Sequence, residues 1–381
     1  MGIQGASRRA RRCRALGVGL LAAAASIVPA LSLAASAGAV SVQHSSGPSA
    51  TLNGAGSTFD QPLFTRAFYF YHQAHSNITV NYASIGSGGG EQQFEAGTVN
   101  FGASDVPMLS ADLAKVPASA GPVIQVPVAL GGEAIAYNVS GISNHLHMTP
   151  SVLASIFLGQ ITNWDDPAIK AINPKTTFPS EPITVVHRAD GSGTTYIFTN
   201  YMAEISPTWA SKVGIGKTVS WPVGVGGQGN EGVAGDIQQT PGAIGYVELA
   251  YVLENPSMQD FELQNPKGAY VLPTQASVAA DAALHPHVSA TNFSITDLGG
   301  SKVSYPISGY SWALIYQNQT NTTTGTALVN LFYWLTRTSG GQGSAGHIGY
   351  VPLPSNVQQL SKTELLKVVG SNGKKLLKIS K

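Results

Sequence analysis

Short β-branched and apolar runs alternate along the chain with segments whose apolar residues recur at helical spacing. The predicted strands are 78–82, 99–103, 123–128 and 183–186. The predicted helices are 62–72, 151–158 and 196–202. In the first helix Phe64, Phe68 and Tyr71 are spaced to form one buried face, and Ser151 is expected to cap the second. This alternation predicts an α/β protein with mixed, mostly parallel sheets.

Glycines and small polar residues occur where three of the helices are expected to begin. These turns are 54–59, 86–90 and 188–195. Ser57 or Thr58 is expected to cap the helix after the first turn, and the helix after the second is expected to open at Glu91. In parallel α/β folds ligands bind beyond the carboxyl ends of strands, where unpaired N–H groups of a helix start attract anions. A single Gly-rich turn occurs often by chance, so the repetition is what favours an anion site over ordinary turns.

Charged residues accompany these turns. Arg188 offers five N–H donors in a planar fork that suits a tetrahedral oxyanion, and Asp190 can hold this guanidinium in place. Asp105 follows the predicted strand 99–103 and would repel a bound anion unless the ligand carries a proton that the carboxylate can accept. The alternative for Asp105 is an ordinary turn or cap carboxylate.

The first 39 residues are expected to be a secretory signal peptide. Five Arg residues between positions 8 and 14 precede an apolar stretch at 16–33, and small residues suggest cleavage after Ala37 or Ala39. A retained membrane anchor is the alternative, although the apolar stretch is slightly short for a span. A polar linker over 40–50 is expected to follow.

The single cysteine, Cys13, lies before the apolar stretch and not where a lipid-modified cysteine is expected. We therefore expect no lipid anchor, and a mature chain without disulfides or thiolate chemistry. An exported protein without disulfides is more typical of bacteria than of a eukaryotic secretory route. The expected location is the periplasm or the outer face of the cell membrane.

Cleavage changes the sign of the net charge. The chain has 21 basic and 20 acidic residues, and losing five Arg leaves 16 basic residues and a charge of −4. A sparsely charged, slightly acidic protein is not suited to bind nucleic acid, so no such partner is expected. Any bound anion must be held by local groups. The roughly 340 remaining residues are enough for two ordinary domains.

The sequence offers little support for metal-dependent or nucleophilic chemistry. Two pairs of histidines, His72/His75 and His145/His147, lack further metal-binding residues nearby in the sequence. No metal and no cofactor is therefore expected. An exported phosphohydrolase is the alternative, with Ser192 or Thr194 as nucleophile, but His187 is the only histidine near these motifs.

Seven segments carry a pattern shared with a known family. They are 54–59 (GAGSTF), 86–89 (GSGG), 101–105 (FGASD), 156–166, 189–194 (ADGSGT), 221–227 and 241–248. In order and spacing this pattern resembles the PstS family, the phosphate-binding proteins of bacterial ABC phosphate importers, over about residues 52–354. The resemblance implies a two-domain, type II periplasmic-binding-protein fold that holds its ligand in the interdomain cleft, and a binding function without catalysis.

The resemblance also implies which residues bind phosphate. By position they are Thr58, Phe59, Ser87, Asp105, Arg188, Asp190, Ser192, Gly193 and Thr194. Phe59 would contribute its backbone N–H, Asp105 would accept the hydrogen bond of the phosphate P–O–H, and Asp190 would orient Arg188 and meet the ligand's proton. At Gly88 the sequence departs from relatives that often carry a second Ser, and the segment past 354 matches poorly.

The implied domains are 51–133 together with 308–381, and 134–307, with crossings near 131–132 and 305–309. Domain closure is expected to present the loaded form to a transmembrane permease of the importer, and the protein is expected to be a monomer. A surface protein that only scavenges phosphate, using the same site, is the remaining alternative.

Overall fold

The computed structural model describes residues 47–143, 145–295 and 300–378. Residues 44–381 form one compact unit. The predicted signal peptide and most of the predicted linker lie outside the described residues. Of the helices that are described, none is long and apolar enough to span a bilayer.

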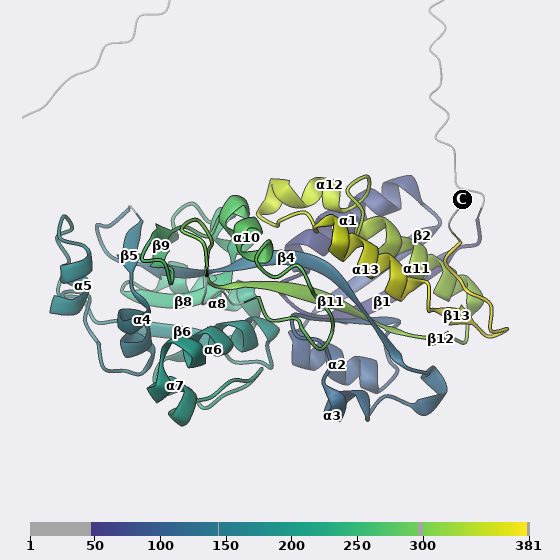
Figure 1. Cartoon of the computed structure of the whole chain (residues 1–381), viewed down its shortest axis with the longest axis horizontal. Coiled ribbons are helices and arrows are strands. Elements are labelled where there is room, and N and C mark those ends of the chain that lie inside the picture. Colours follow the sequence, from purple (N-terminus) through teal and green to yellow (C-terminus); the bar gives the residue numbers. More distant parts are fainter. Residues whose placement is uncertain (1–46, 144, 296–299, 379–381) are drawn as a thin grey trace, which may run out of the picture. The chain divides into compact units, whose positions relative to one another are not determined.

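Thirteen strands and thirteen α-helices alternate along the described chain (Figure 1). The strands are β1 (Ala50–Gly56), β2 (Ile78–Ser84), β3 (Phe101–Ser104), β4 (Val123–Asn138), β5 (Leu146–Met148), β6 (Thr184–Arg188), β7 (Val225–Gly227), β8 (Ala243–Glu248), β9 (Gln259–Gln264), β10 (Tyr270–Val271), β11 (Ser308–Tyr316), β12 (Asn318–Gln319) and β13 (Val369–Gly370). The helices are α1 (Gln61–Ala74), α2 (Ser87–Glu95), α3 (Ser110–Leu113), α4 (Pro150–Phe157), α5 (Pro167–Ile172), α6 (Gly193–Ile205), α7 (Pro207–Lys212), α8 (Gly229–Gln239), α9 (Leu249–Leu253), α10 (Gln275–Ala282), α11 (Thr322–Leu335), α12 (Gln342–Ala345) and α13 (Ser355–Leu365).

One long sheet runs through this compact unit. Its strand order is β2-β1-β3-β11-β4-β8-β6-β7, with β9 beside β4 and β5 and β10 beside β9. Neighbours around β1 and β6 are parallel, whereas β11 is antiparallel to β3 and β4, and β4 is antiparallel to β8. The predicted mixed α/β architecture is therefore confirmed.

Strands β4 and β11 connect the two halves of the sheet (Figure 1). Strand β4 pairs with β11 over 123–132 and with β8 over 133–138. We call the half around β1, β2 and β3 lobe I and the half around β6, β7 and β8 lobe II. The predicted domain limits stay a prediction.

Each lobe has its own apolar core. In lobe I Phe64 packs edge-on against Phe101, and both lie in a cluster that includes residues of α11. In lobe II Phe198 of α6 stacks on Tyr246 of β8 with ring centroids 4.3 Å apart. The aromatic face predicted for the first helix is therefore core.

All the predicted strands and helices are present, but two predicted helix caps and two predicted helix starts are wrong. Helix α6 begins at Gly193, three residues before the predicted 196. Helix α1 has Asp60 at its N-cap position, because the hydroxyls of Ser57 and Thr58 bind elsewhere. Helix α2 begins at Ser87, four residues before Glu91, because Gly86 adopts a φ of +81° that turns the chain directly into the helix.

Helix α4 is capped by Thr149 and not by Ser151, since the Thr149 side chain accepts the N–H of Val152. Strand β4 also extends ten residues beyond the predicted 123–128. Gly131, Gly132 and Glu133 interrupt its apolar pattern, yet nearly the whole strand is buried.

Candidate functional site

The starts of helices α2 and α6 bring the two lobes into contact. The Ser87 hydroxyl oxygen, at the first residue of α2, accepts the N–H of Gly193 at 3.0 Å and that of Asp105 at 3.3 Å. The N–H of Gly88 donates to the carbonyl oxygen of Gly191 at 2.8 Å. A Cβ on Gly193 would lie 2.5 Å from the Cβ of Asp105, so only glycine allows this approach.

Arg188 ends strand β6 and carries its charge into the interior, where only 3% of the residue is exposed. Its Nε and Nη2 donate to the two carboxylate oxygens of Asp190 at 2.7 and 2.5 Å. Its Nη1 donates to the Thr194 hydroxyl at 3.3 Å, and the N–H of Gly229 donates to Asp190 at 3.1 Å. The guanidinium is therefore fixed in one orientation at the start of α6.

The two partners shift each other's pKa. Burial opposes the charge of Arg188, yet the bonds to Asp190 and its negative charge raise the pKa of the guanidinium. Burial alone would raise the pKa of Asp190, but the same bonds hold it below its ordinary value. Both groups are charged at neutral pH.

Asp105 follows β3 and points its carboxylate toward Thr194. The hydroxyls of Ser57 and Ser311 donate to its Oδ1, the second at 2.9 Å, and Thr194 donates to its Oδ2 at 3.3 Å. Burial raises the pKa of Asp105, while these hydroxyls and the charge of Arg188 act in the opposite direction. The carboxyl is thus held rigidly as a hydrogen-bond acceptor at the junction of the lobes.

A second buried carboxyl, Asp60, shares the Ser311 hydroxyl with Asp105. The Ser311 oxygen lies 2.7 Å from Oδ2 of Asp60 and 2.9 Å from Oδ1 of Asp105. A hydroxyl has one proton, so one of the two carboxyls must donate in return. Burial and the charge of Asp105 raise the pKa of Asp60 well above its ordinary value, which identifies Asp60 as the protonated partner.

Two further buried glutamates lie where β4 meets β8. Glu133 and Glu248 are opposite one another in the strand register, and both are fully buried. Burial and the charge of Asp105 raise the pKa of Glu133 well above its ordinary value, and burial does the same for Glu248. The interior near Arg188 is therefore rich in carboxyls, and burial favours the neutral form of Asp60, Glu133 and Glu248.

Thr58 of lobe I is bound by lobe II through Asn230. The backbone N–H and side-chain Nδ2 of Asn230 donate to the Thr58 hydroxyl oxygen at 3.0 and 2.9 Å. Nδ2 also donates to Thr194 at 3.2 Å. The N–H of Phe59 donates to the Ser57 hydroxyl at 3.0 Å.

The structure thus brings the predicted residues of both lobes together. Ser192 takes part as the N-cap of α6, where its hydroxyl accepts the N–H of Thr195 at 3.1 Å. Sequence reasoning missed the residues that support this group, namely Ser57, Asp60, Asn230 and Ser311. Asn230 had a signal, because Gly227, Gln228 and Gly229 precede it and form a fourth Gly-rich helix start.

His187 is used for packing. Its ring stacks on Trp221 with centroids 4.5 Å apart, and its Nδ1 lies 3.1 Å from the carbonyl oxygen of Arg188. Burial lowers the pKa of His187. Within residues 47–143, 145–295 and 300–378, no group of three or more His, Cys, Asp or Glu side chains is arranged to hold a metal ion.

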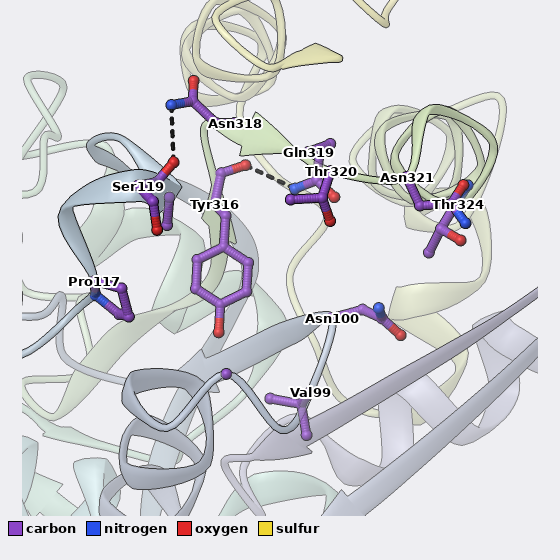
Figure 2. A pocket seen from close by; sticks show the side chains of 12 residues that line it. Val99, Asn100, Pro117, Ser119, Tyr316, Asn318, Gln319, Thr320, Asn321 and Thr324 are labelled. Carbon is purple, nitrogen blue, oxygen red and sulfur yellow. Dashed lines mark hydrogen bonds between the residues drawn. The ribbon is translucent and has the colours of Figure 1, made fainter. Parts of the chain in front are cut away.

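A separate groove of about 430 Å³ lies in lobe I, and Asn100, Tyr316 and Gln319 are among the residues that line it (Figure 2). The side chains of the described residues that line it are all uncharged. Asn318 and Gln319 donate to backbone carbonyl oxygens there, at 3.2 and 2.7 Å. An anion has no charged partner in this groove, so the junction of the lobes is the better candidate site.

Known proteins share this sequence and fold. A family model described as a PBP superfamily domain matches residues 41–339. The phosphate-binding protein PstS of Xylella fastidiosa (strain Temecula1) is 42% identical over 312 residues, which cover 81% of this chain and 83% of that protein. PstS of Pasteurella multocida (strain Pm70) is 39% identical over 330 residues, 86% of this chain and 93% of that protein.

Among solved structures, the high-affinity periplasmic phosphate-binding protein PfluDING, bound with phosphate, aligns with a TM-score of 0.64. It is 22% identical, and the alignment covers 82% of this chain and 93% of that chain. This similarity confirms the predicted two-domain, type II periplasmic-binding-protein fold. The sequence identities confirm the resemblance, and the chain belongs to the PBP superfamily and, within it, to the PstS family of phosphate-binding proteins.

Proposed function

We propose that this protein binds inorganic phosphate between its two lobes and delivers it to an ABC importer. The observation that carries the proposal is the meeting of the α2 and α6 starts beside the buried Arg188. The Ser87–Gly193 bond links the two lobes at 3.0 Å, and Arg188 lies within the same network. A desolvated anion gains strongly from fixed donors of this kind.

The donors proposed to hold phosphate come from both lobes. They are the hydroxyls of Thr58, Ser87, Ser192 and Thr194, the N–H groups of Phe59 and Gly193, and the guanidinium of Arg188, which Asp190 orients. The N–H groups of Phe59 and Gly193 and the Thr194 hydroxyl donate within the protein in this structure, so we propose that they turn to phosphate when it binds. The hydroxyl oxygens of Ser87 and Thr58 accept bonds from the protein, so their protons can point at a ligand. Each hydrogen bond to a charged ligand contributes about 1.5–3 kcal/mol.

Asp105 would select for an oxyanion that carries a proton. Its Oδ1 is already bound by two hydroxyls, so Oδ2 is the oxygen that can accept a P–O–H bond. Sulfate has no proton at neutral pH and would place its lone pairs against this carboxylate. Phosphate is therefore favoured over sulfate without a large positive field.

Delivery requires the lobes to open and close. We propose the domain limits 51–133 with 308–381, and 134–307, with hinges where β4 and β11 cross between the lobes. The closed, loaded monomer would then be recognised by the importer's transmembrane permease at the outer face of the cell membrane. The description of PfluDING as periplasmic supports an exported location.

Titration calorimetry with phosphate, arsenate and sulfate tests the binding function. We expect tight 1:1 binding of phosphate and no measurable heat with sulfate at neutral pH. Absence of phosphate binding overturns the proposal. A parallel assay with a chromogenic phosphate ester addresses the enzymatic alternative, and sustained turnover would replace the binding function with a phosphohydrolase.

A transport assay addresses delivery. We expect the protein, when supplied with its importer in proteoliposomes, to stimulate ATP-dependent phosphate uptake. Phosphate binding without any such stimulation would favour a scavenger at the cell surface.

A further inference from the structure

Lys217 of lobe II reaches across to lobe I outside the proposed phosphate site. It lies in the loop between α7 and β7. Its ammonium group bonds Oε2 of Glu91 on α2 and lies 3.6 Å from Oδ2 of Asp112 on α3. One cation of lobe II is therefore shared by two carboxylates of lobe I.

The backbone of the same residue supports the start of α6. The carbonyl oxygen of Lys217 accepts the N–H of Ser192, the N-cap of α6, at 2.8 Å. The neighbouring N–H of Gly216 donates to the Thr199 hydroxyl of α6 at 3.2 Å. The ammonium group and the α6 end of the site therefore belong to one connected piece of lobe II.

The cation that pairs with the buried Glu91 carboxylate comes from the other lobe, so this pairing requires contact between the lobes. Only 4% of Glu91 is exposed, and its Oε1 accepts the Ser104 hydroxyl at 2.8 Å. Burial raises the pKa of Glu91, and the charge of Lys217 opposes this effect. A buried carboxylate that loses its paired cation is strongly disfavoured, so separating the lobes must either rehydrate Glu91 or protonate it.

We propose that Lys217 is a latch that holds the lobes closed and slows ligand release. The proposal rests on the proposed phosphate-binding function, because the bound ligand is what the closed form retains. Lys217 can bond Glu91 only when the lobes are closed. The ion pair therefore stabilises the closed state relative to the open state, in which it is absent. No donor of the proposed site is part of this pair, so it sets residence time and not the choice of ligand.

Lys115 provides a matched control. Its ammonium group lies 2.8 Å from Asp112 and 3.7 Å from Glu95, all within lobe I. Its side chain is 57% exposed, against 21% for that of Lys217. Neutralising Lys115 makes the same change in net charge and removes a bond to the same Asp112, but the ion pairs of Lys115 itself all lie within lobe I.

The test is stopped-flow measurement of phosphate association and release for wild type, Lys217→Met and Lys115→Met. We expect Lys217→Met to release phosphate about tenfold faster with little change in association, because a buried pair acts mainly on dissociation. Lys115→Met is expected to match wild type. The ratio of phosphate to sulfate affinity should be unchanged in both variants.

Glu91→Gln gives a second route to the same result, since it removes the charge and keeps an acceptor for Ser104. We expect faster release in Glu91→Gln, and no further acceleration when Lys217→Met is added. Wild-type release rates in Lys217→Met, or equal acceleration in Lys115→Met, overturn the latch alone. A wild-type protein that binds no phosphate overturns the proposed function together with the latch.

Discussion

Arg188 and Asp190 form a buried ion pair, in which each charge offsets the desolvation cost of burying the other. The bidentate contact uses the planar fork of the guanidinium, which a lysine ammonium cannot reproduce. Because the pair carries no net charge, the site must attract an anion mainly through oriented N–H and O–H dipoles. In the proposed site, selectivity would then depend on Asp105, the carboxylate whose Oδ2 accepts the Thr194 hydroxyl.

Replacing Asp105 with Asn tests this selectivity. Asn keeps the shape but can donate as well as accept, so sulfate no longer meets only lone pairs. We expect the preference for phosphate over sulfate to fall by up to about 10⁴-fold, since sites built around one obligatory hydrogen bond discriminate at this level. Competition calorimetry measures the ratio.

Asp60→Asn is the control for that experiment, because it changes a neighbouring buried carboxyl that also contacts Ser311. Burial and the charge of Asp105 raise the pKa of Asp60 well above its ordinary value, which favours its neutral form, and Asn is a neutral replacement of similar shape. We expect the preference for phosphate to persist in this variant. An Asp105→Asn protein that still ignores sulfate would show that Asp105 has another role.

At the scale of elements, two helix starts approach each other without side chains between them. A Cβ on Gly88 would lie 3.2 Å from Cα and from the carbonyl oxygen of Gly191, which is tighter than an ordinary contact. The backbone bond from Gly88 to Gly191, at 2.8 Å, depends on this closeness. A Ser at position 88 would need the two turns to move apart by a few tenths of an ångström.

We therefore expect Gly88→Ala to weaken phosphate binding by about tenfold, from about 1–2 kcal/mol of overpacking that occurs only when the lobes close. Titration calorimetry gives the affinity. Gly235→Ala in α8 is the control, because no atom lies within 4 Å of its added Cβ. Equal affinity of Gly88→Ala and wild type would mean that binding does not require this close approach.

The sequence predicts these elements better than it predicts their contacts. Apolar periodicity and Gly-rich turns are local signals, and they locate the predicted strands and helices and the Gly-rich turns before α1, α2 and α6, although not every helix start. The cap of α1 could not be predicted in this way, because the Thr58 hydroxyl accepts a hydrogen bond from Asn230, which lies 172 residues away. Ser311 joins Asp105 over 206 residues, and no local pattern indicates that partnership.

Strand β4 shows a second limit of local patterns. A strand buried on both faces normally reads as a continuous apolar run. Here two glycines and Glu133 occur where the strand passes from one lobe to the other. Burial raises the pKa of Glu133 and so favours its neutral form at this position, an effect that periodicity alone cannot reveal.

Across the whole molecule, buried carboxyls give stability a defined dependence on pH. Burial raises the pKa values of Asp60, Glu133 and Glu248 well above their ordinary values. The folded protein then binds more protons than the unfolded chain between the ordinary carboxyl pKa and the raised one. Stability is greatest below the ordinary pKa and is lost as pH rises through the raised value.

Glu133→Gln should flatten this dependence. Gln is neutral at every pH, so the variant escapes the cost of ionising Glu133 at alkaline pH while behaving like wild type near pH 5. Urea unfolding at about pH 5, 7 and 9 measures the free energy of unfolding. Glu254→Gln, at an exposed residue, should leave the wild-type slope intact. An unchanged slope in Glu133→Gln would mean that Glu133 keeps an ordinary pKa.

The pairing of β4 with β11 also affects the order in which the two lobes can fold during synthesis. Strands β3 and β4 both pair with β11, which begins only at Ser308. The strands β4, β8 and β6 of lobe II are all present earlier in the chain. In a chain that emerges amino end first, lobe II can assemble while lobe I still lacks its central strand. The proposed phosphate site between the lobes would then be the last part of the molecule to form.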